Sequence, residues 1–244
     1  HDDFSLFKNA LKDLEVMFTN VINSAFENIS TVPEGVLLTE TFFLLAKRDA
    51  VFRCIERKAG DMHHLFMRQV QAARTEFEQH RLSPPLRLTE PQYAGASLWA
   101  HGLGCNVKEN YEMIMHLDHI LSTRDSEEAK EAYQAIMSVI SDFKSNRYNQ
   151  WIELLNEKAK DNGLHLRLDI PLLRREQVDG QQKGAGGIVC NFDEELLSLF
   201  SEVNYWEKFH GGGFPIPYVA HDICNMKEPL RIMREHVMLL VRSY

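Results

Sequence analysis

Apolar residues recur at steps of three and four along nearly the whole chain, and this spacing limits what the chain can fold into. The most regular pattern lies at the N-terminus and makes a seam of about three heptads: Phe4, Phe7, Leu11, Leu14, Phe18, Val21 and Ala25. No stretch alternates as a half-buried strand does, hairpin signals are missing, and no tandem repeat of fixed period occurs. The sequence therefore predicts an all-α fold, an elongated stack of helical bundles.

Proline and glycine residues divide these patterns into helical regions. Pro33 and Gly35 are expected to break the first pattern, and a second region covers about 37–82 with an interruption near Gly60. Ser83-Pro84-Pro85 ends the second region, because proline cannot continue a helix and restricts the residue before it.

More helical patterns follow this loop. One is expected to start within 91–103, and apolar helix faces then lie within 113–121 and 129–155. Asp161-Asn162-Gly163 is a stop signal typical of helix C-termini. Residues 164–173 are expected to form a short extended stretch.

Two helices are expected to close the chain. The first opens with Asn191 and has Glu194 three residues later, the spacing of a capping box. The second is expected to start at Pro229, because proline suits the first helical position. The predicted organisation has four parts: an N-terminal helical bundle segment (1–88), a central helical bundle (89–175), a flexible Gly-rich loop (176–187) and a C-terminal helical hairpin (188–244).

The composition is that of an ordinary globular protein. Hydrophobic residues make up 44% and charged residues 25% of the 244 positions. The net charge is −8, with 35 acidic against 27 basic residues and no basic run, which argues against binding to nucleic acid or to an anionic membrane.

The cysteines and the chain ends bear on the cellular compartment. Cys54, Cys105, Cys190 and Cys224 are scattered without a C-x-x-C spacing, which favours reduced thiols in a cytosolic compartment over disulfides or a zinc site. No signal peptide opens the sequence, and no apolar run is long enough to span a bilayer. Because the chain stops at Tyr244 directly after a helical pattern, we expect it to be a fragment of a longer protein.

The stretch His210-Gly211-Gly212-Gly213 resembles the oxyanion-hole glycines of some lipases and esterases. Such enzymes place their serine in a G-x-S-x-G turn within a parallel sheet, and no G-x-S-x-G occurs here. The nearest phrase, Gly95-Ala96-Ser97-Leu98-Trp99, lacks the second glycine. The glycines are therefore expected to end a helix and let the chain turn toward Pro215 and Pro217.

Other groups with reactive chemistry lack the pattern of a site. Lys183-Gly184-Ala185-Gly186-Gly187 has no Gly-Lys-Ser/Thr ending of a phosphate-binding loop, so it is expected to be a surface loop. His116 and His119 lie one turn apart, but Asp118 projects from another side and no third metal ligand is evident. The adjacent pair His63-His64 cannot face one ion from one helix.

Three acidic residues lie opposite an apolar helix face and are expected to form a solvated surface rather than a catalytic pair: Glu127, Glu128 and Glu131. None of the cysteines shows the features of a nucleophile. The sequence accordingly assigns no catalytic, cofactor-binding or metal-binding residue, and it favours a helical scaffold or interaction module.

The closing segment, "NFDEELLSLFSEVNYWEKF" followed by "FPIP" and "PLRIMREHVMLLVRSY", resembles the N-terminal tail region of dynein heavy chains. The residues that carry this resemblance are Asn191, Phe192, Asp193, Leu196, Leu197, Glu202, Val203, Tyr205, Trp206, Pro217 and Tyr244. "PQYAGASLWAHGL" with Trp99, "YNQWIELL" with Trp151 and "LAKRDAVFRCIERK" are similar to the tail as well. The triple glycine departs from the family, which has a tighter turn there.

The resemblance implies a non-catalytic tail segment of a dynein, closer to axonemal than to cytoplasmic dyneins. Such a segment would anchor the motor to its cargo or doublet microtubule, and it would bind dynein intermediate and light chains, other heavy chains and docking proteins. ATP and magnesium would belong to the motor ring of the parent chain, with no cofactor in this segment. The expected location is the cytoplasm, the cytoskeleton and the ciliary axoneme. Two alternatives stay open, an unrelated spectrin-like or armadillo-like scaffold and, more remotely, a hydrolase that uses His210 and the glycines.

Overall fold

The computed structural model describes residues 2–121, 126–160, 173–175, 188–190, 194–209 and 213–243. Its α-helices are α1 (Asp2–Phe26), α2 (Val32–Phe43), α3 (Asp49–His80), α4 (Gln92–Leu121), α5 (Ser126–Lys160), α6 (Glu194–Lys208) and α7 (His221–Ser243). A short 3-10 helix, η1, covers Tyr218–Ala220, and two strands cover Leu173–Arg175 (β1) and Ile188–Cys190 (β2). These elements confirm the predicted all-α fold class.

The chain forms two compact units that interleave in sequence. Unit 1 comprises His1–Ser83 and Gly102–Ser141, and unit 2 comprises Pro84–His101 and Asp142–Tyr244. Helix α4 passes from unit 2 into unit 1 at residue 102, and α5 passes from unit 1 into unit 2 at residue 142. The four-part organisation expected from the sequence stays a prediction.

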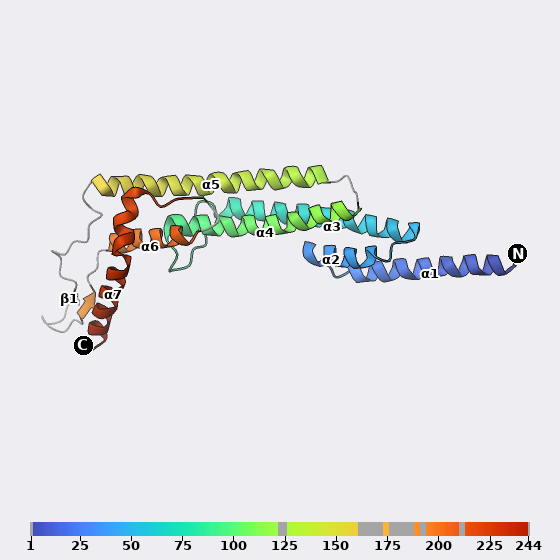
Figure 1. Cartoon of the computed structure of the whole chain (residues 1–244), viewed down its shortest axis with the longest axis horizontal. Coiled ribbons are helices and arrows are strands. Elements are labelled where there is room, and N and C mark those ends of the chain that lie inside the picture. Colours follow the sequence, from blue (N-terminus) through green and yellow to red (C-terminus); the bar gives the residue numbers. More distant parts are fainter. Residues whose placement is uncertain are drawn as a thin grey trace. The chain divides into compact units, whose positions relative to one another are not determined.

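In unit 1, helices α1 and α2 pack against α3 (Figure 1). The α3, α4 and α5 segments of this unit meet through aromatic rings: Phe66 on α3 lies 6.1 Å from Tyr111 on α4, which stacks on Tyr133 of α5 at 4.1 Å. The most deeply buried side chains of the unit are Ile22, Val32, Val36, Ile55, Phe66, Ile114, Leu117 and Ile140. Burial of these apolar side chains supplies the main stabilising term.

The prediction that Pro33 and Gly35 break the helical pattern is wrong, because both lie inside α2. Pro33 stands in the first turn, where its missing N–H has no partner to lose. Gly35 is buried where α2 meets α3, and a Cβ atom on it would lie 1.9 Å from Sδ of Met62. The glycine thus permits a close helix contact rather than a turn.

Two further helix boundaries differ from the prediction. Helix α3 continues through Gly60, and the interruption of this region lies instead at residues 44–48, before α3 begins. The last helix begins at His221, so Pro229 lies within α7 and not at its first position. A proline inside a helix removes one backbone hydrogen bond, and a long helix keeps the others. The patterns within 91–103 and 113–121 belong to one continuous helix, α4.

In unit 2, α6 and α7 pack against each other, and the strands β1 and β2 form an antiparallel pair in which Leu173 faces Cys190. This pair is not anticipated from the sequence, because three residues per strand are too few to show an alternating pattern. The predicted loop 176–187 and the capping residue Asn191 lie outside the described residues, as does the extended stretch 164–173 except for Leu173. Among the described helices, none has both the length and the apolar content that a membrane span requires.

Candidate functional site

An aromatic cluster forms the core of unit 2. Trp151 on α5 and Trp206 on α6 are almost fully buried, and their rings lie 5.6 Å apart. Tyr148 contacts both tryptophans, and its hydroxyl donates a hydrogen bond to the carbonyl oxygen of Pro215. Burial raises the pKa of this hydroxyl, which keeps it a donor. Trp151 and Trp206, two tryptophans of the motif segments, are thus packing residues.

Glu202 on α6 is a buried carboxylate that caps a helix distant in sequence. Its two oxygens accept hydrogen bonds from the backbone N–H groups of Tyr93 (2.7 Å) and Ala94 (2.8 Å), in the first turn of α4. The side chain is 3% exposed, and burial raises its pKa to about 7 against the opposing effect of these hydrogen bonds. The carboxylate satisfies amide groups that no helical partner reaches, so its role in the fold is to fix α6 to the start of α4.

Within the stretch 210–213, the structure describes Gly213, and its backbone has the conformation of a turn. Gly213 has a φ of +63°, in the left-handed region that favours glycine. The next residue, Phe214, packs its ring against both Tyr148 and Trp206. His210, Gly211 and Gly212 lie outside the described residues. Ser97, the serine of the nearest elbow-like phrase, is fully buried in α4; a substrate could not reach it there.

Two of the four histidines considered as metal ligands, His63 and His116, instead pair with carboxylates on other helices. His63 Nε2 on α3 lies 2.9 Å from Asp118 Oδ1 on α4, and His116 Nε2 on α4 lies 2.7 Å from Glu40 Oε1 on α2. Thus His116 contacts α2 and Asp118 contacts α3, so the two side chains do not point toward one common site. No group of three potential metal ligands occurs among the described side chains.

The remaining candidate groups are the three acidic residues of α5 and the cysteines. Glu127, Glu128 and Glu131 are exposed, as expected of a solvated surface. The side chain of Cys54 is buried and that of Cys105 is half-buried. The side chains of Cys190 and Cys224 lie outside the part of the chain whose side chains are described.

Helix α1 carries eight large apolar residues that are exposed to solvent. Its predicted seam is open to solvent over most of its length, with Phe4 71%, Phe7 62%, Leu14 56% and Val21 57% exposed. Burial on α1 is confined to its C-terminal part, at Ile22 and Phe26. Large apolar side chains in a continuous exposed stripe are typical of a binding surface. The sequence predicts the stripe but not its exposure, because core-facing and partner-facing seams have the same period.

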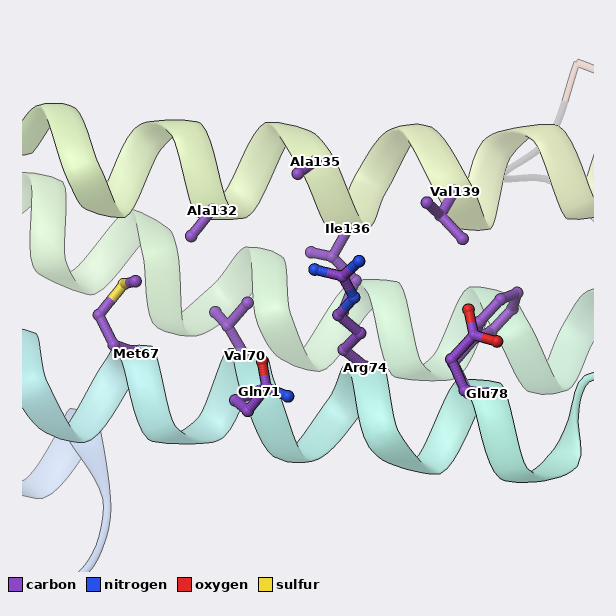
Figure 2. A pocket seen from close by; sticks show the side chains of 10 residues that line it. Met67, Val70, Gln71, Arg74, Glu78, Ala132, Ala135, Ile136 and Val139 are labelled. Atoms are coloured by element: carbon purple, nitrogen blue, oxygen red, sulfur yellow. The ribbon is translucent and has the colours of Figure 1, made fainter.

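A second apolar feature of unit 1 is a groove of about 240 Å³ between α3 and α5. Figure 2 shows Ala132, Ala135 and Ile136 of α5 facing Val70 and Arg74 of α3 across it. The groove has no local signal in the sequence, because its walls come from residues more than fifty positions apart.

Comparisons with known proteins match the whole chain. The family described as "Dynein heavy chain, N-terminal region 1" matches residues 1–244. The chain is 34% identical over 244 residues to dynein axonemal heavy chain 2 of Homo sapiens and 32% identical to that of Mus musculus. It is 29% identical over 246 residues to the dynein-1-beta heavy chain of the flagellar inner arm I1 complex of Chlamydomonas reinhardtii. Each match covers 100% of this chain and 5% of the relative.

Proposed function

Since the chain belongs to the dynein heavy chain family, as part of its non-catalytic N-terminal tail region, we propose that it is a stem segment that anchors the motor through partner chains. The partners in this proposal are dynein intermediate and light chains, other heavy chains and docking proteins on doublet microtubules. The family match replaces the alternative of an unrelated scaffold.

The observation that supports partner binding is the exposed face of α1, which we define as Phe4, Phe7, Leu14, Phe18 and Val21. These residues repeat at heptad spacing and are 39–71% exposed. Burying five such side chains against a partner helix would contribute on the order of 10 kcal/mol before the costs of association. A surface of this kind suits a tail that holds other chains.

The names of the relatives support a ciliary setting. Two are called axonemal heavy chains, and a third is named for a flagellar inner arm complex. The proposed location is therefore the cytoskeleton of the ciliary axoneme, beside the cytoplasm expected from the sequence. ATP hydrolysis with magnesium is proposed for the rest of the parent heavy chain and not for this segment.

The test is recovery of partners by the tagged 244-residue chain from a ciliary extract, quantified by mass spectrometry. We expect intermediate chains, light chains or docking proteins with the native chain. A variant with Phe7→Glu and Leu14→Glu should lose them, because charged side chains cannot be buried in the apolar contact.

The matched control places the same two charges elsewhere on α1. Asn9 and Asn20 are exposed and lie off the apolar face, so the Asn9→Glu and Asn20→Glu variant should recover partners as the native chain does. Equal recovery by the Phe7 and Leu14 variant would show that the α1 face is not the contact. Recovery of no dynein component by the native chain would overturn the proposal.

A further inference from the structure

The α3/α5 groove lies beside a helix packing that has room for one more helix. In unit 1, α3 contacts α4 through His63 and Asp118, and α4 contacts α5 through Tyr111 and Tyr133. When one helix packs against two others in this way, a fourth helix can be laid into the groove between those two, as in four-helix bundles. Figure 2 shows α4 behind the groove, so its open side faces away from α4.

The shape and lining of the groove suit the side chains of a helix rather than a small molecule. Val70, Phe77 and Ile136 are buried at its base, and Val139 is 41% exposed on its wall. The small side chains of Ala132 and Ala135 create the hollow on the α5 side (Figure 2). A volume of about 240 Å³ is below the usual range for small-molecule pockets, about 300–1,000 Å³.

The charged residues beside the groove indicate which charge a partner helix bound there should carry. Glu128 and Glu131 are exposed on α5, each four positions before one of the two groove alanines, so they continue the same strip of the helix surface. Arg74 and Glu78, one cation and one anion, line the opposite wall on α3. A helix seated in the groove would therefore meet an acidic edge along α5.

From these features we propose that the α3/α5 groove binds an amphipathic helix of a partner chain whose apolar face is flanked by lysine or arginine. Large apolar residues of that helix fill the space over Ala132 and Ala135. Its basic flank pairs with Glu128 and Glu131. This surface is distinct from the α1 face, and it gives the stem a second contact with a different charge preference.

The test uses two synthetic amphipathic peptides of about three heptads, identical in their leucine positions and flanked either by lysines or by glutamates. Binding to the 244-residue chain is measured by fluorescence anisotropy. The chain carries Phe7→Glu and Leu14→Glu so that the α1 face does not capture the peptides. We expect the lysine-flanked peptide to bind at least about tenfold more tightly than the glutamate-flanked one, with a preference that weakens as salt rises.

Two sets of variants locate the binding. Ala132→Leu with Ala135→Leu fills the hollow and should weaken the lysine-flanked peptide by about tenfold or more. Glu128→Lys with Glu131→Lys should reverse the preference between the two peptides. The controls are Gln134→Leu on another side of α5 and Glu76→Lys on another side of α3, both at exposed positions; neither should change the affinities.

Three results would overturn the inference. They are no binding of either peptide, an affinity that filling the groove leaves unchanged, and tighter binding of the glutamate-flanked peptide to the chain with Glu128 and Glu131 intact. Circular dichroism of each variant confirms that the helices are formed. Because the α1 face is already substituted, none of these outcomes bears on the proposed function.

Discussion

At the residue scale, the Glu202 carboxylate links the stability of unit 2 to pH. Its pKa is raised from an ordinary value of 4.5 to about 7, because the loss of hydration outweighs the hydrogen bonds from Tyr93 and Ala94. Between these two values, the folded chain holds a proton on Glu202 that the unfolded chain has released. The free energy of unfolding therefore rises as the pH falls through this window, and the contribution levels off near pH 4.5.

When the pH is lowered from about 8 to about 5.5, we expect protonation of Glu202 to raise the free energy of unfolding of unit 2 by about 2 kcal/mol. Denaturant titration followed by tryptophan fluorescence measures it, since all three tryptophans, Trp99, Trp151 and Trp206, belong to unit 2. The comparison is with Glu202→Gln, which keeps one carbonyl acceptor but does not titrate. The two chains differ only at residue 202, so the difference between their pH dependences isolates Glu202. Equal pH dependence in the two chains would refute this assignment.

At the element scale, the contact between α2 and α3 depends on the absence of a side chain at Gly35. A Cβ atom added to Gly35 would lie 1.9 Å from the Sδ atom of Met62, and Met62 is itself buried. We expect Gly35→Ala to lower the free energy of unfolding by about 1–3 kcal/mol, because α2 or Met62 must shift. Denaturation followed by circular dichroism, which reports on all helices, measures the change.

The same substitution elsewhere in unit 1 is expected to act in the opposite direction. Gly60 lies inside α3, and a Cβ atom at this position would meet no atom within 4 Å apart from its own stretch of helix. Gly60→Ala should raise the free energy of unfolding by about 0.5–1 kcal/mol, because alanine loses less backbone entropy in a helix. If both variants changed stability in the same direction, the close α2–α3 contact would not be the cause.

Local patterns in the sequence predict the helices but not their partners. The α1 seam and the apolar face of α6 are periodic, so both helices follow from the residues themselves. Pro33 and Pro229 mislead, because a proline is tolerated in a first helical turn and a long helix can hold one inside. The cap formed by Glu202 joins residues 109 positions apart, and such a pairing has no local signal. The turn at Gly213 is predictable, since a left-handed residue is a local requirement that glycine meets.

At the scale of the whole molecule, exposed apolar area is unevenly distributed over the described chain. Five large apolar residues of the α1 face are exposed, Phe4, Phe7, Leu14, Phe18 and Val21, whereas the exposed residues Leu6, Val16 and Met17 project from other sides of this helix. Without a partner, such a surface promotes association, which the net charge of −8 opposes only over short distances in salt.

We expect the isolated chain to associate reversibly as its concentration rises, measured by sedimentation velocity. Phe7→Glu with Leu14→Glu should weaken this association by about a hundredfold or more, because two apolar contacts are lost. The Asn9→Glu and Asn20→Glu variant adds the same charge and should associate as the native chain does. A native chain whose sedimentation does not depend on concentration would contradict this prediction.

The passage of α4 through both units limits how the length of this chain can change in evolution. Residues up to His101 pack in one unit and residues from Gly102 pack in the other, without a break in the helix. Each inserted or deleted residue turns the following part of a helix by about 100° about its axis. A single-residue insertion in α4 would turn the buried side chains beyond it toward solvent, whereas an insertion of about seven residues would nearly restore their phase. Lineage-specific insertions are therefore expected in the segments between helices, and those within α4 should come in whole heptads.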